Sequence, residues 1–576
     1  MNNIDDAIQA EAGFKAAIRR KEGQEQKKGR VLLINPGINS LPVDKTMGMF
    51  PNNGIMILGT ILKQNNFDVK IIDGRYLSIE EVINQVMSFA DEDLIFVGLG
   101  IMTIQLKYSY LVSTGIKKRN PNITIVWGGV HPTLFPEQTI SDNAVDVCVV
   151  NQCASTIVDL ADAIAGTADI KNVPGIYYKA DGKIISTQSN CTQDDFDIVP
   201  FLDFSIMNHE DYSRNNNVAM DSTLDDDFKK YIVYPINTAL GCNFKCTFCI
   251  NEILQTRHLL RSAEEIVDRI KFLQKEYGAN YIHFNDENFF ANKERIYKFV
   301  ELIRREKIKI KWRPSVNACY FNKRYINDEF VKELEESGMI IAVMGFESGS
   351  VDMLKRLKKP LRVDAIYRSI DTLSKTKIIS RATFMTGLPG ETEEQMKETF
   401  DLALDLEKRY PAFQGNILPF RLYPGSPLYD EAVKEYGYTP PESIAEWIKF
   451  EDSEIVESVG YQHSSHYPWI PDKNKYELRN KIYRTYQKTQ WNTQRLGGTS
   501  NTNFQEKIKY YVFLSIFKLS RSRLRNQYYK FHFENKLLKL LLDIRQLYLS
   551  AKSLIISERP KHLVIKHKRW PYIDHS

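Results

Sequence analysis

The chain has 576 residues, of which 43% are apolar and 26% charged, a composition that excludes a mainly disordered protein. Its 77 Lys and Arg nearly balance 72 Asp and Glu, and the net charge of +5 excludes a general polyanion binder, so we expect no nucleic-acid partner. No stretch approaches the roughly 18 apolar residues of a membrane span, and seven cysteines in so long a chain exclude a secreted disulfide scaffold.

Residues 1–29 are predicted to be a polar N-terminal extension. They lack the apolar segment of a secretory signal, so we expect a cytoplasmic protein. Residues 30–166 alternate short apolar runs with helix-like stretches, which predicts a doubly wound parallel sheet covered on both faces. Its five expected strands are residues 31–34, 69–72, 94–97, 123–126 and 145–149. The ligand crevice of such a domain lies at the carboxyl ends of the strands.

Glycines follow the third and fourth of these strands, at Gly98, Gly100, Gly128 and Gly129. They either let the backbone approach a ligand or only form tight turns between strand and helix. Residues 167–230 are predicted to be a connector. It contains a β-hairpin, because two apolar runs flank Asp181-Gly182.

Residues 231–436 alternate strands and helices at a longer spacing. The six expected strands are residues 232–236, 281–284, 310–316, 340–344, 382–385 and 417–420. Helices are expected over residues 262–277 and 392–406, the second with a capping box of Thr392 and Gln395. Six β/α units predict a full or partial parallel barrel, whose chemistry lies at the C-terminal ends of the strands. The expected fold class is therefore α/β.

Residues 437–576 are predicted to form a basic helical C-terminal domain. From Gln505 onward there are 16 Lys and Arg against 5 Asp and Glu. This charge either attracts an anionic substrate or a membrane surface, or is a solvated face. A helix over residues 507–525 mixes charged and apolar side chains on one stripe, which disfavours a membrane-surface helix but leaves peripheral membrane contact as an alternative.

Three cysteines crowd together just after the first barrel strand. Cys242, Cys246 and Cys249 follow a CxxxCxxC spacing. Three thiolates on one loop can ligate three irons of a 4Fe–4S cluster and leave the fourth iron open. A structural zinc site is the alternative, but it needs four ligands, and the nearest fourth candidate is His258, nine residues beyond Cys249. The spacing therefore favours an iron–sulfur cluster.

This barrel region resembles the radical S-adenosylmethionine (SAM) superfamily. The resemblance implies that the three cysteines hold the cluster and that Phe248, the aromatic residue before the third cysteine, contacts the adenine. Asp286 and Glu287, after the second strand, are the implied ligands of the methionyl amino group, since a carboxylate suits an ammonium. Helix capping by Asp286 or Asn288 is the alternative.

Two further SAM contacts follow from the same resemblance. Glu347, in Gly345-Phe346-Glu347-Ser348-Gly349, is implied to bind the ribose hydroxyls. Arg381, just before the fifth strand, either pairs with the SAM carboxylate or is a surface arginine.

The N-terminal domain and the Gly387-Leu388-Pro389-Gly390 segment resemble a narrower branch, the cobalamin-binding radical SAM enzymes, which include class B methyltransferases and oxidative cyclases. The implied cobalamin contacts are Met102, Thr103, Gly128, Gly129, Val130 and His131. The chain departs from this branch in two places. No Asp-x-His-x-x-Gly follows the first strand, and residues 151–154 are Asn-Gln-Cys-Ala where the branch often has Gly-Glu-Gly-Glu. The second departure leaves open a member without cobalamin.

The resemblance implies an enzyme in which a 5′-deoxyadenosyl radical activates a carbon of a small-molecule or lipid-like substrate and cobalamin donates a methyl group to it. An external one-electron reductant such as flavodoxin or ferredoxin is the implied partner. Two alternatives stay open. One is a radical SAM cyclase or rearrangement enzyme, with or without cobalamin, and the other is a non-catalytic metal-binding protein. No residue beyond the cofactor sites is assigned a catalytic role.

Overall fold

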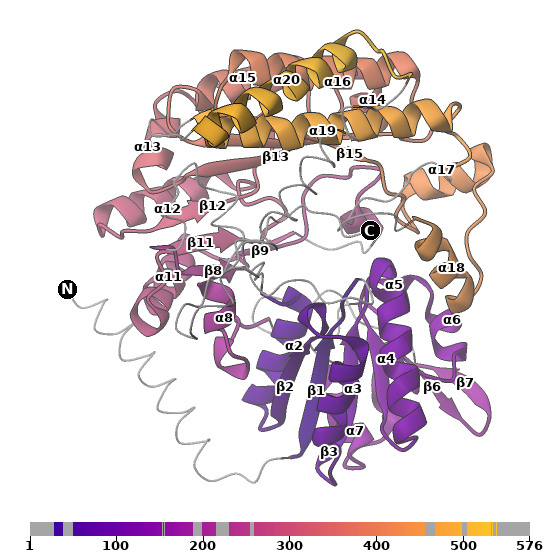
Figure 1. The fold of residues 1–576 in the computed structure, drawn as a ribbon. Coiled ribbons are helices and arrows are strands. Elements are labelled where there is room, and N and C mark those ends of the chain that lie inside the picture. The colour runs from indigo at the N-terminus through magenta and orange to yellow at the C-terminus, as the bar shows by residue number, and fades with distance from the viewer. Residues whose placement is uncertain are drawn as a thin grey trace, which may run out of the picture.

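The computed structural model describes residues 28–38, 50–151, 156–187, 199–214, 230–253, 258–454, 467–497 and 504–530, together with residues 154, 533 and 537. The expected N-terminal extension lies almost wholly outside the described residues, as do Gln152 and Cys153. Figure 1 shows the N-terminal sheet domain (indigo and purple) below the barrel (magenta and pink), with the long C-terminal helices across the top.

Five parallel strands form the centre of the N-terminal sheet, as predicted. They are β1 (Arg30–Asn35), β2 (Asp68–Asp73), β3 (Leu94–Gly100), β4 (Ile125–Gly128) and β5 (Val147–Val149). The strand order is β2-β1-β3-β4-β5-β6-β7. The order reverses between β1 and β3, which is where a doubly wound fold opens its ligand crevice.

The predicted hairpin extends this sheet. β6 (Ile176–Ala180) pairs antiparallel with β5, and β7 (Lys183–Ser186) pairs with β6. Without the hairpin, β5 would present a row of unpaired backbone groups at the sheet edge. The expected boundary at residue 166 is therefore wrong, because the sheet of the first domain continues to Ser186.

Helices cover both faces of the sheet, because alternate residues of its strands are apolar on both sides. In β1, Val31 and Leu33 belong to one core, and Leu32 and Ile34 belong to the other. The first core contains α2 (Asn53–Gln64) and α7 (Ile157–Ile164). The second contains α3 (Ile79–Ser88), α4 (Leu106–Arg119) and α6 (Pro136–Ser141). The short helix α5 (Val130–Leu134) follows β4.

Six parallel strands form a partial barrel, as predicted, with somewhat different bounds. They are β8 (Val233–Ile236), β11 (Tyr281–Phe284), β12 (Lys311–Arg313), β13 (Ile341–Glu347), β14 (Ile379–Thr386) and β15 (Phe413–Pro419). The strands make two sheets, β12-β11-β8 and β13-β14-β15. Two parallel bridges, Trp312 to Met339 and Ser315 to Val343, join the sheets at a seam.

The barrel helices are α11 (Ala263–Tyr277), α12 (Lys293–Arg305), α13 (Phe330–Glu336), α14 (Val351–Arg356), α15 (Val363–Leu373) and α16 (Glu393–Arg409). The predicted capping box of Thr392 and Gln395 is confirmed at the start of α16. A second one, of Ser262 and Glu265, starts α11. Such reciprocal bonds satisfy backbone groups that a helix start leaves without intrahelical partners.

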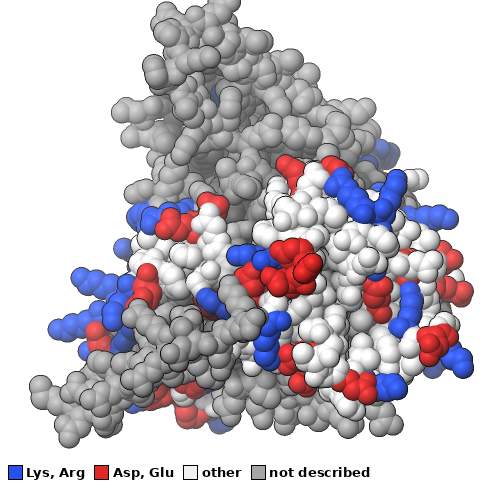
Figure 2. All heavy atoms as spheres, turned by 90° about the horizontal axis from the view of Figure 1, so that it is seen from below, with Lys and Arg blue, Asp and Glu red and all other residues white. Residues whose placement is uncertain are grey.

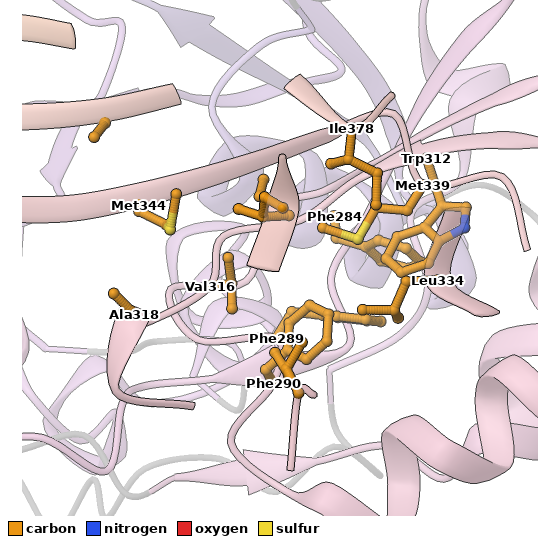
Figure 3. Packing of buried hydrophobic residues seen from close by; sticks show 14 of the residues in the cluster. Phe284, Phe289, Phe290, Trp312, Val316, Ala318, Leu334, Met339, Met344 and Ile378 are labelled. Carbon is orange, nitrogen blue, oxygen red and sulfur yellow. The ribbon is translucent and has the colours of Figure 1, made fainter. Parts of the chain in front are cut away.

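Aromatic side chains fill the space between strands and outer helices (Figure 3). Phe284 of β11 stacks on Phe289 with 4.2 Å between ring centroids, and Trp312 of β12 lies 5.8 Å from Phe284. The Trp312 indole N–H donates to the Ser337 carbonyl at 3.0 Å. Because Phe289 closely follows Glu287, this packing fixes the direction in which the loop leaves β11.

The C-terminal region is helical, as predicted, and its helices pack on the other two parts of the chain. These helices are α17 (Pro427–Tyr436), α18 (Ile444–Glu454), α19 (Lys473–Gly497) and α20 (Phe504–Arg525). Ile444 and Trp447 of α18 join the N-terminal core. In α19, the Tyr483 hydroxyl accepts a bond from Ile417 N at 3.1 Å, and Gln487 donates to the Gly415 carbonyl at 3.3 Å. These bonds cover the open edge of β15.

The helix expected over residues 507–525 directs apolar side chains at the protein. Phe517 stacks on Tyr486 of α19 with 5.0 Å between centroids, and Leu524 is buried in the barrel core. This packing gives the membrane-surface alternative no support. Most of the basic tail beyond residue 530 lies outside the described residues. In the described part of the chain, no helix has both the length and the apolar content needed to cross a bilayer. Figure 2 shows one face of the molecule, on which Lys and Arg are interspersed with Asp and Glu.

Gly338, at the seam between the two barrel sheets, is a position that does not tolerate a side chain. Gly338 has φ +100°, and a Cβ there would overlap the Ile310 carbonyl oxygen. We expect Gly338→Ala to lower the free energy of unfolding by about 2–4 kcal/mol, because left-handed strain and backbone collision add. The measurement is urea unfolding followed by circular dichroism. The control is Gly437→Ala, which has φ +69° and open space around its Cβ. Equal shifts for both variants would contradict this reading of the seam.

Candidate functional site

The cysteine loop follows the first barrel strand and is held between neighbouring segments. It is preceded by β9 (Ala239–Leu240), which pairs with β10 (Leu259–Leu260). Thr247 N donates to the Leu357 carbonyl at 3.1 Å, and Leu428 N donates to the Thr247 carbonyl at 3.1 Å. These backbone bonds fix the loop between the end of α14 and the start of α17, on the C-terminal side of the barrel.

Cys242, Cys246 and Cys249 carry free thiols in one electrostatic environment. Burial is the main reason that the pKa of Cys246 rises to about 11, while Lys359 opposes this rise and Cys249 adds to it. Burial also raises the pKa of Cys242 and of Cys249. Metal binding deprotonates such thiols, so ligation and proton release are coupled. Three free thiols on one loop, beside a cation, fit the donor set of a 4Fe–4S cluster.

The zinc alternative gains no support from the structure. Among the residues that the structure describes, no three His, Cys, Asp or Glu side chains surround a position for one metal ion.

Asp286 anchors the chain that leads into the cysteine loop. One carboxylate oxygen accepts the backbone N–H of Thr238 at 2.6 Å and of Ala239 at 2.9 Å, and the other accepts the Thr238 hydroxyl. Arg295 donates to the Thr238 carbonyl at 3.0 Å. Asp286 is 2% exposed and its oxygens are occupied, so it is not placed to bind the methionyl amino group. The expectation for Asp286 is therefore wrong, and so is its capping alternative.

Glu287 is exposed where its neighbour Asp286 is buried. The surrounding protein nevertheless desolvates the Glu287 carboxyl enough to raise its pKa to about 7. An accessible but poorly hydrated carboxylate binds an ammonium more strongly than a fully hydrated one does. Of the two acids predicted for the methionyl amino group, Glu287 is the one whose position suits the role.

Glu347 ends β13 in an unusual backbone conformation. Its φ is +66°, at a bulge where the pairing of β13 with β14 shifts register. Its carboxylate pairs with Lys359 at 3.0 Å. A Cβ at Gly345 would collide with that carboxylate and come within 3.1 Å of Lys359 Nζ. Strain of this kind, of order 1–3 kcal/mol, is typical of functional positions, and a bulge redirects a side chain.

Phe248 and Arg381 differ in how well they match expectation. Phe248 is half-buried and packs against the apolar cluster that contains Met353 and Leu388, beside the cysteine loop. Arg381 is the third residue of the eight-residue strand β14, rather than preceding it, and donates to Gln414 Oε1 at 2.8 Å. It lies near the N-terminal start of β14, away from the C-terminal strand ends where a SAM carboxylate is expected.

Two site residues were missed from the sequence. Asn288 does not cap a helix. It donates to Asn243 Oδ1 in the cysteine loop at 2.7 Å and to the Tyr320 hydroxyl at 2.8 Å. The other is Lys359, which lies in a run of charged residues that resembles any solvated face. The Asn-rich segment after β11 was a signal for Asn288, whereas no sequence signal distinguishes Lys359 from its neighbours.

The expected cobalamin residues lie at the carboxyl ends of β3 and β4. Met102 is 39% exposed directly after β3, so its side chain is accessible to a ligand in the crevice. The Gln105 side chain accepts from Met102 N at 3.0 Å and donates to the Pro36 carbonyl at 2.8 Å. Gly129 has φ +100°, and a Cβ there would press on Ile101 backbone atoms. In these loops, backbone atoms and the Met102 side chain therefore face the crevice. Val130 is half-buried and is the first residue of α5.

His131 is not exposed to the crevice, so its expected cobalamin contact is wrong. The ring is fully buried, 5.2 Å from the Phe135 ring and 5.7 Å from that of Trp447, between ring centroids. Burial lowers its pKa to about 3, so the ring is neutral at working pH. Its Nδ1 lies 3.3 Å from Thr103 Oγ1. His131 therefore contacts the Thr103 hydroxyl from the protein interior.

The two domains bring their C-terminal strand edges together. A Cβ at Gly425, in the loop after β15, would lie 3.1 Å from Ile253 and 3.3 Å from Leu134. Ile253 belongs to α10 (Ile250–Ile253), directly after the cysteines, and Leu134 ends α5 of the N-terminal domain. Asn285 also donates to Asn53 Oδ1 at 3.1 Å across the interface. The segment directly after the cysteines and α5 of the N-terminal domain therefore both lie against the loop that follows β15.

Comparisons with known proteins agree with this division. Residues 40–161 match the B12 binding domain, and residues 236–403 match the radical SAM superfamily. The chain is 27% identical over 412 residues to an uncharacterized methyltransferase of Pyrococcus horikoshii, which covers 70% of this chain and 83% of that protein. It is 24% identical over 413 residues to the anaerobic magnesium-protoporphyrin IX monomethyl ester cyclase of Rubrivivax gelatinosus, which covers 70% of each.

The fold is also similar to a solved structure of OxsB, a cobalamin-dependent SAM radical enzyme with aqua-cobalamin and SAM bound. The two superpose with a TM-score of 0.58 at 17% identity, over 90% of this chain and 75% of that one. The likeness extends from the N-terminal sheet into the C-terminal helices.

The role of Asp286 predicts a loss of cluster content. Asp286→Ala leaves two buried N–H groups, of Thr238 and Ala239, without an acceptor, which costs roughly 1–3 kcal/mol each. We expect anaerobically purified Asp286→Ala to hold less than half the iron and sulfide of the parent protein. Glu287→Gln, one residue away and exposed, is the control and should keep both. Full iron in Asp286→Ala would contradict the anchoring role.

The raised pKa of Glu287 predicts a pH dependence of SAM binding. A carboxyl with a pKa of about 7 is neutral below that pH and then cannot balance an ammonium. We expect the Kd for SAM, measured by anaerobic titration calorimetry, to rise about tenfold from well above pH 7 to pH 6. The SAM amino group stays protonated on the acid side. Glu287→Gln should bind weakly at every pH, and an unchanged slope in that variant would refute the assignment.

Proposed function

The chain joins a B12-binding domain to a radical SAM domain, and we propose from this pairing that it is a cobalamin-dependent radical SAM methyltransferase acting on carbon. One structural observation supports the proposal in addition to the match with the two domain families. The loop after β15 packs against both α10, beside the cysteines, and α5, beside the expected cobalamin loops. Methyl transfer to a substrate radical needs both cofactors close together, and this packing supports the proposal.

We propose the following residues for each cofactor. Cys242, Cys246 and Cys249 would ligate the 4Fe–4S cluster. Glu287 would hold the methionyl amino group of SAM, Glu347 would accept hydrogen bonds from its ribose hydroxyls, and Phe248 would flank the adenine. Met102 and Thr103, with the backbone at Gly128 and Gly129, would border the cobalamin. When bound, the cluster and SAM supply a radical that removes hydrogen from carbon, and cobalamin supplies the methyl group.

The inner face of the barrel is the place that we propose for the substrate. Along β14, Arg381, Thr383 and Met385 are half-exposed, whereas Ala382 and Phe384 between them are buried against the outer helices. Arg381, Thr383 and Met385 therefore point away from the packed outer face of β14. A small molecule entering there would lie below the cysteine loop and away from bulk water, which protects a reactive intermediate. The electron would come from an external one-electron reductant.

A second candidate is a radical SAM cyclase. The 24% identity to the magnesium-protoporphyrin cyclase supports this second candidate, because that match extends over 413 residues and is longer than either domain alone. The products that the enzyme forms from SAM distinguish a methyltransferase from a cyclase. A methyltransferase that reloads its cobalamin from SAM releases S-adenosylhomocysteine as well as 5′-deoxyadenosine, whereas a cyclase releases 5′-deoxyadenosine alone.

The test uses the anaerobically purified chain reconstituted with iron, sulfide and hydroxocobalamin. With SAM and dithionite we expect both 5′-deoxyadenosine and S-adenosylhomocysteine, detected by liquid chromatography and mass spectrometry. Cys246→Ala should lose at least 100-fold of the 5′-deoxyadenosine, because the cluster loses a ligand. Cys148→Ala is the matched control, since Cys148 is buried in β5 and its pKa is raised by burial to about 12, which makes it inert. 5′-Deoxyadenosine alone would move the assignment to the cyclase, and neither product would overturn both.

A further inference from the structure

We propose that Trp447, which lies beyond the barrel in α18, is a positioning residue for the cobalamin, an inference that rests on the proposed function. Its side chain packs on His131, and His131 in turn contacts the loop after β3, which presents Met102. The helical C-terminal region would therefore support the cobalamin site from the interior of the protein.

Trp447 is fixed against the N-terminal domain, where it is 2% exposed. Its ring centroid lies 5.7 Å from that of His131, with the two planes at 88°, and 5.3 Å from that of Phe135. The indole N–H donates to Gln138 Oε1 at 3.3 Å, and the Gln138 amide donates to the Pro441 carbonyl, in the segment before α18, at 3.5 Å. Edge-to-face ring contacts and hydrogen bonds are directional, so they fix how the indole lies on the imidazole.

His131 makes two contacts with the loop after β3. Its backbone N–H donates to the Ile101 carbonyl at 3.1 Å, and its ring Nδ1 lies 3.3 Å from Thr103 Oγ1. Met102 lies between these two residues and is exposed. The loop is therefore tethered on both sides of Met102 through His131, the residue on which Trp447 packs.

The His131 ring is held in a packed core. It is fully buried, and the Phe135 ring lies 5.2 Å from it between centroids. Trp447 belongs to the same apolar core as Leu99 and Leu106, which precede and follow the loop. Removing the indole would leave a cavity beside the imidazole, and a packed core relaxes into such a cavity only partly. The imidazole and its loop would then occupy more than one position, which lowers the affinity for a ligand that needs a single one.

The test is the Kd for hydroxocobalamin of the anaerobically reconstituted chain, measured by equilibrium dialysis. We expect Trp447→Ala to raise this Kd about tenfold, an effect of the size found for residues that act on a site without contacting its ligand. Trp447→Phe keeps an aromatic ring against His131 and should restore most of the affinity. The matched control is Trp469→Ala, whose Kd should not change. Trp469 is also buried in the C-terminal region, but its indole donates to the Gly387 carbonyl of the barrel at 2.9 Å.

A double-mutant cycle with Thr103→Ala separates positioning from a general loss of stability. If Trp447 acts through the loop, Trp447→Ala should weaken binding less in a chain that already lacks the Thr103 hydroxyl. Independent losses would instead add in full. The urea midpoint of unfolding and the iron content are measured on the same samples, since they report whether the chain is folded and whether the barrel holds its cluster.

The outcomes separate this inference from the proposed function. If Trp447→Ala folds and binds hydroxocobalamin as tightly as the parent chain does, the inference fails and the proposed function stands. It also fails if Trp469→Ala weakens binding equally, or if the losses in the cycle add. If the parent chain binds no hydroxocobalamin, the proposed function fails as well. Should Trp447→Ala not fold, His131→Phe keeps a ring in the core and removes the contact with Thr103, and a Kd equal to that of the parent would then overturn the inference.

Discussion

The candidate site depends on one buried contact, the carboxylate of Asp286 with the backbone at Thr238 and Ala239. This contact joins the ends of the first two barrel strands where the chain leaves β8 for the cysteine loop. Arg295 completes it by donating to the Thr238 carbonyl. Backbone polar groups buried without partners would be costly here, so an acid and a base from neighbouring elements satisfy them. The three cysteines can therefore occupy a fixed place although their own loop has almost no regular structure.

The second constraint is charge. Three thiols, two carboxylates and one ammonium lie at the C-terminal end of the barrel, most of them away from bulk water. In that setting burial raises the pKa of Glu287 and of the thiols, and neighbouring charges modify the shift of the thiols. The division of labour between Asp286 and Glu287 follows from the same physics. The buried acid binds backbone N–H groups, and the accessible acid remains available for a ligand.

Periodicity predicted the architecture well because burial decides it. The five parallel strands of the first domain, the six barrel strands and the capping box at Thr392 follow from local patterns of apolar and capping residues. Long-range pairing was not readable in the same way. The hairpin at Asp181 looked like part of a connector until its pairing with β5 was visible, and α18 gave no sign of packing on the first domain until Trp447 was found against His131. The spacing of the cysteines was specific, whereas the role of Asp286 and the burial of His131 depend on contacts between distant segments.

In the proposed enzyme the cluster and cobalamin would occupy neighbouring loops of the two domains. The most direct test of this arrangement is the magnetic interaction between the reduced cluster and cob(II)alamin in the same reconstituted chain, measured by electron paramagnetic resonance. The account predicts that each signal is broadened or relaxes faster when both cofactors are present than when either is alone, and that Cys246→Ala abolishes the effect. Two signals that are indifferent to one another, in a chain holding both cofactors, would contradict it.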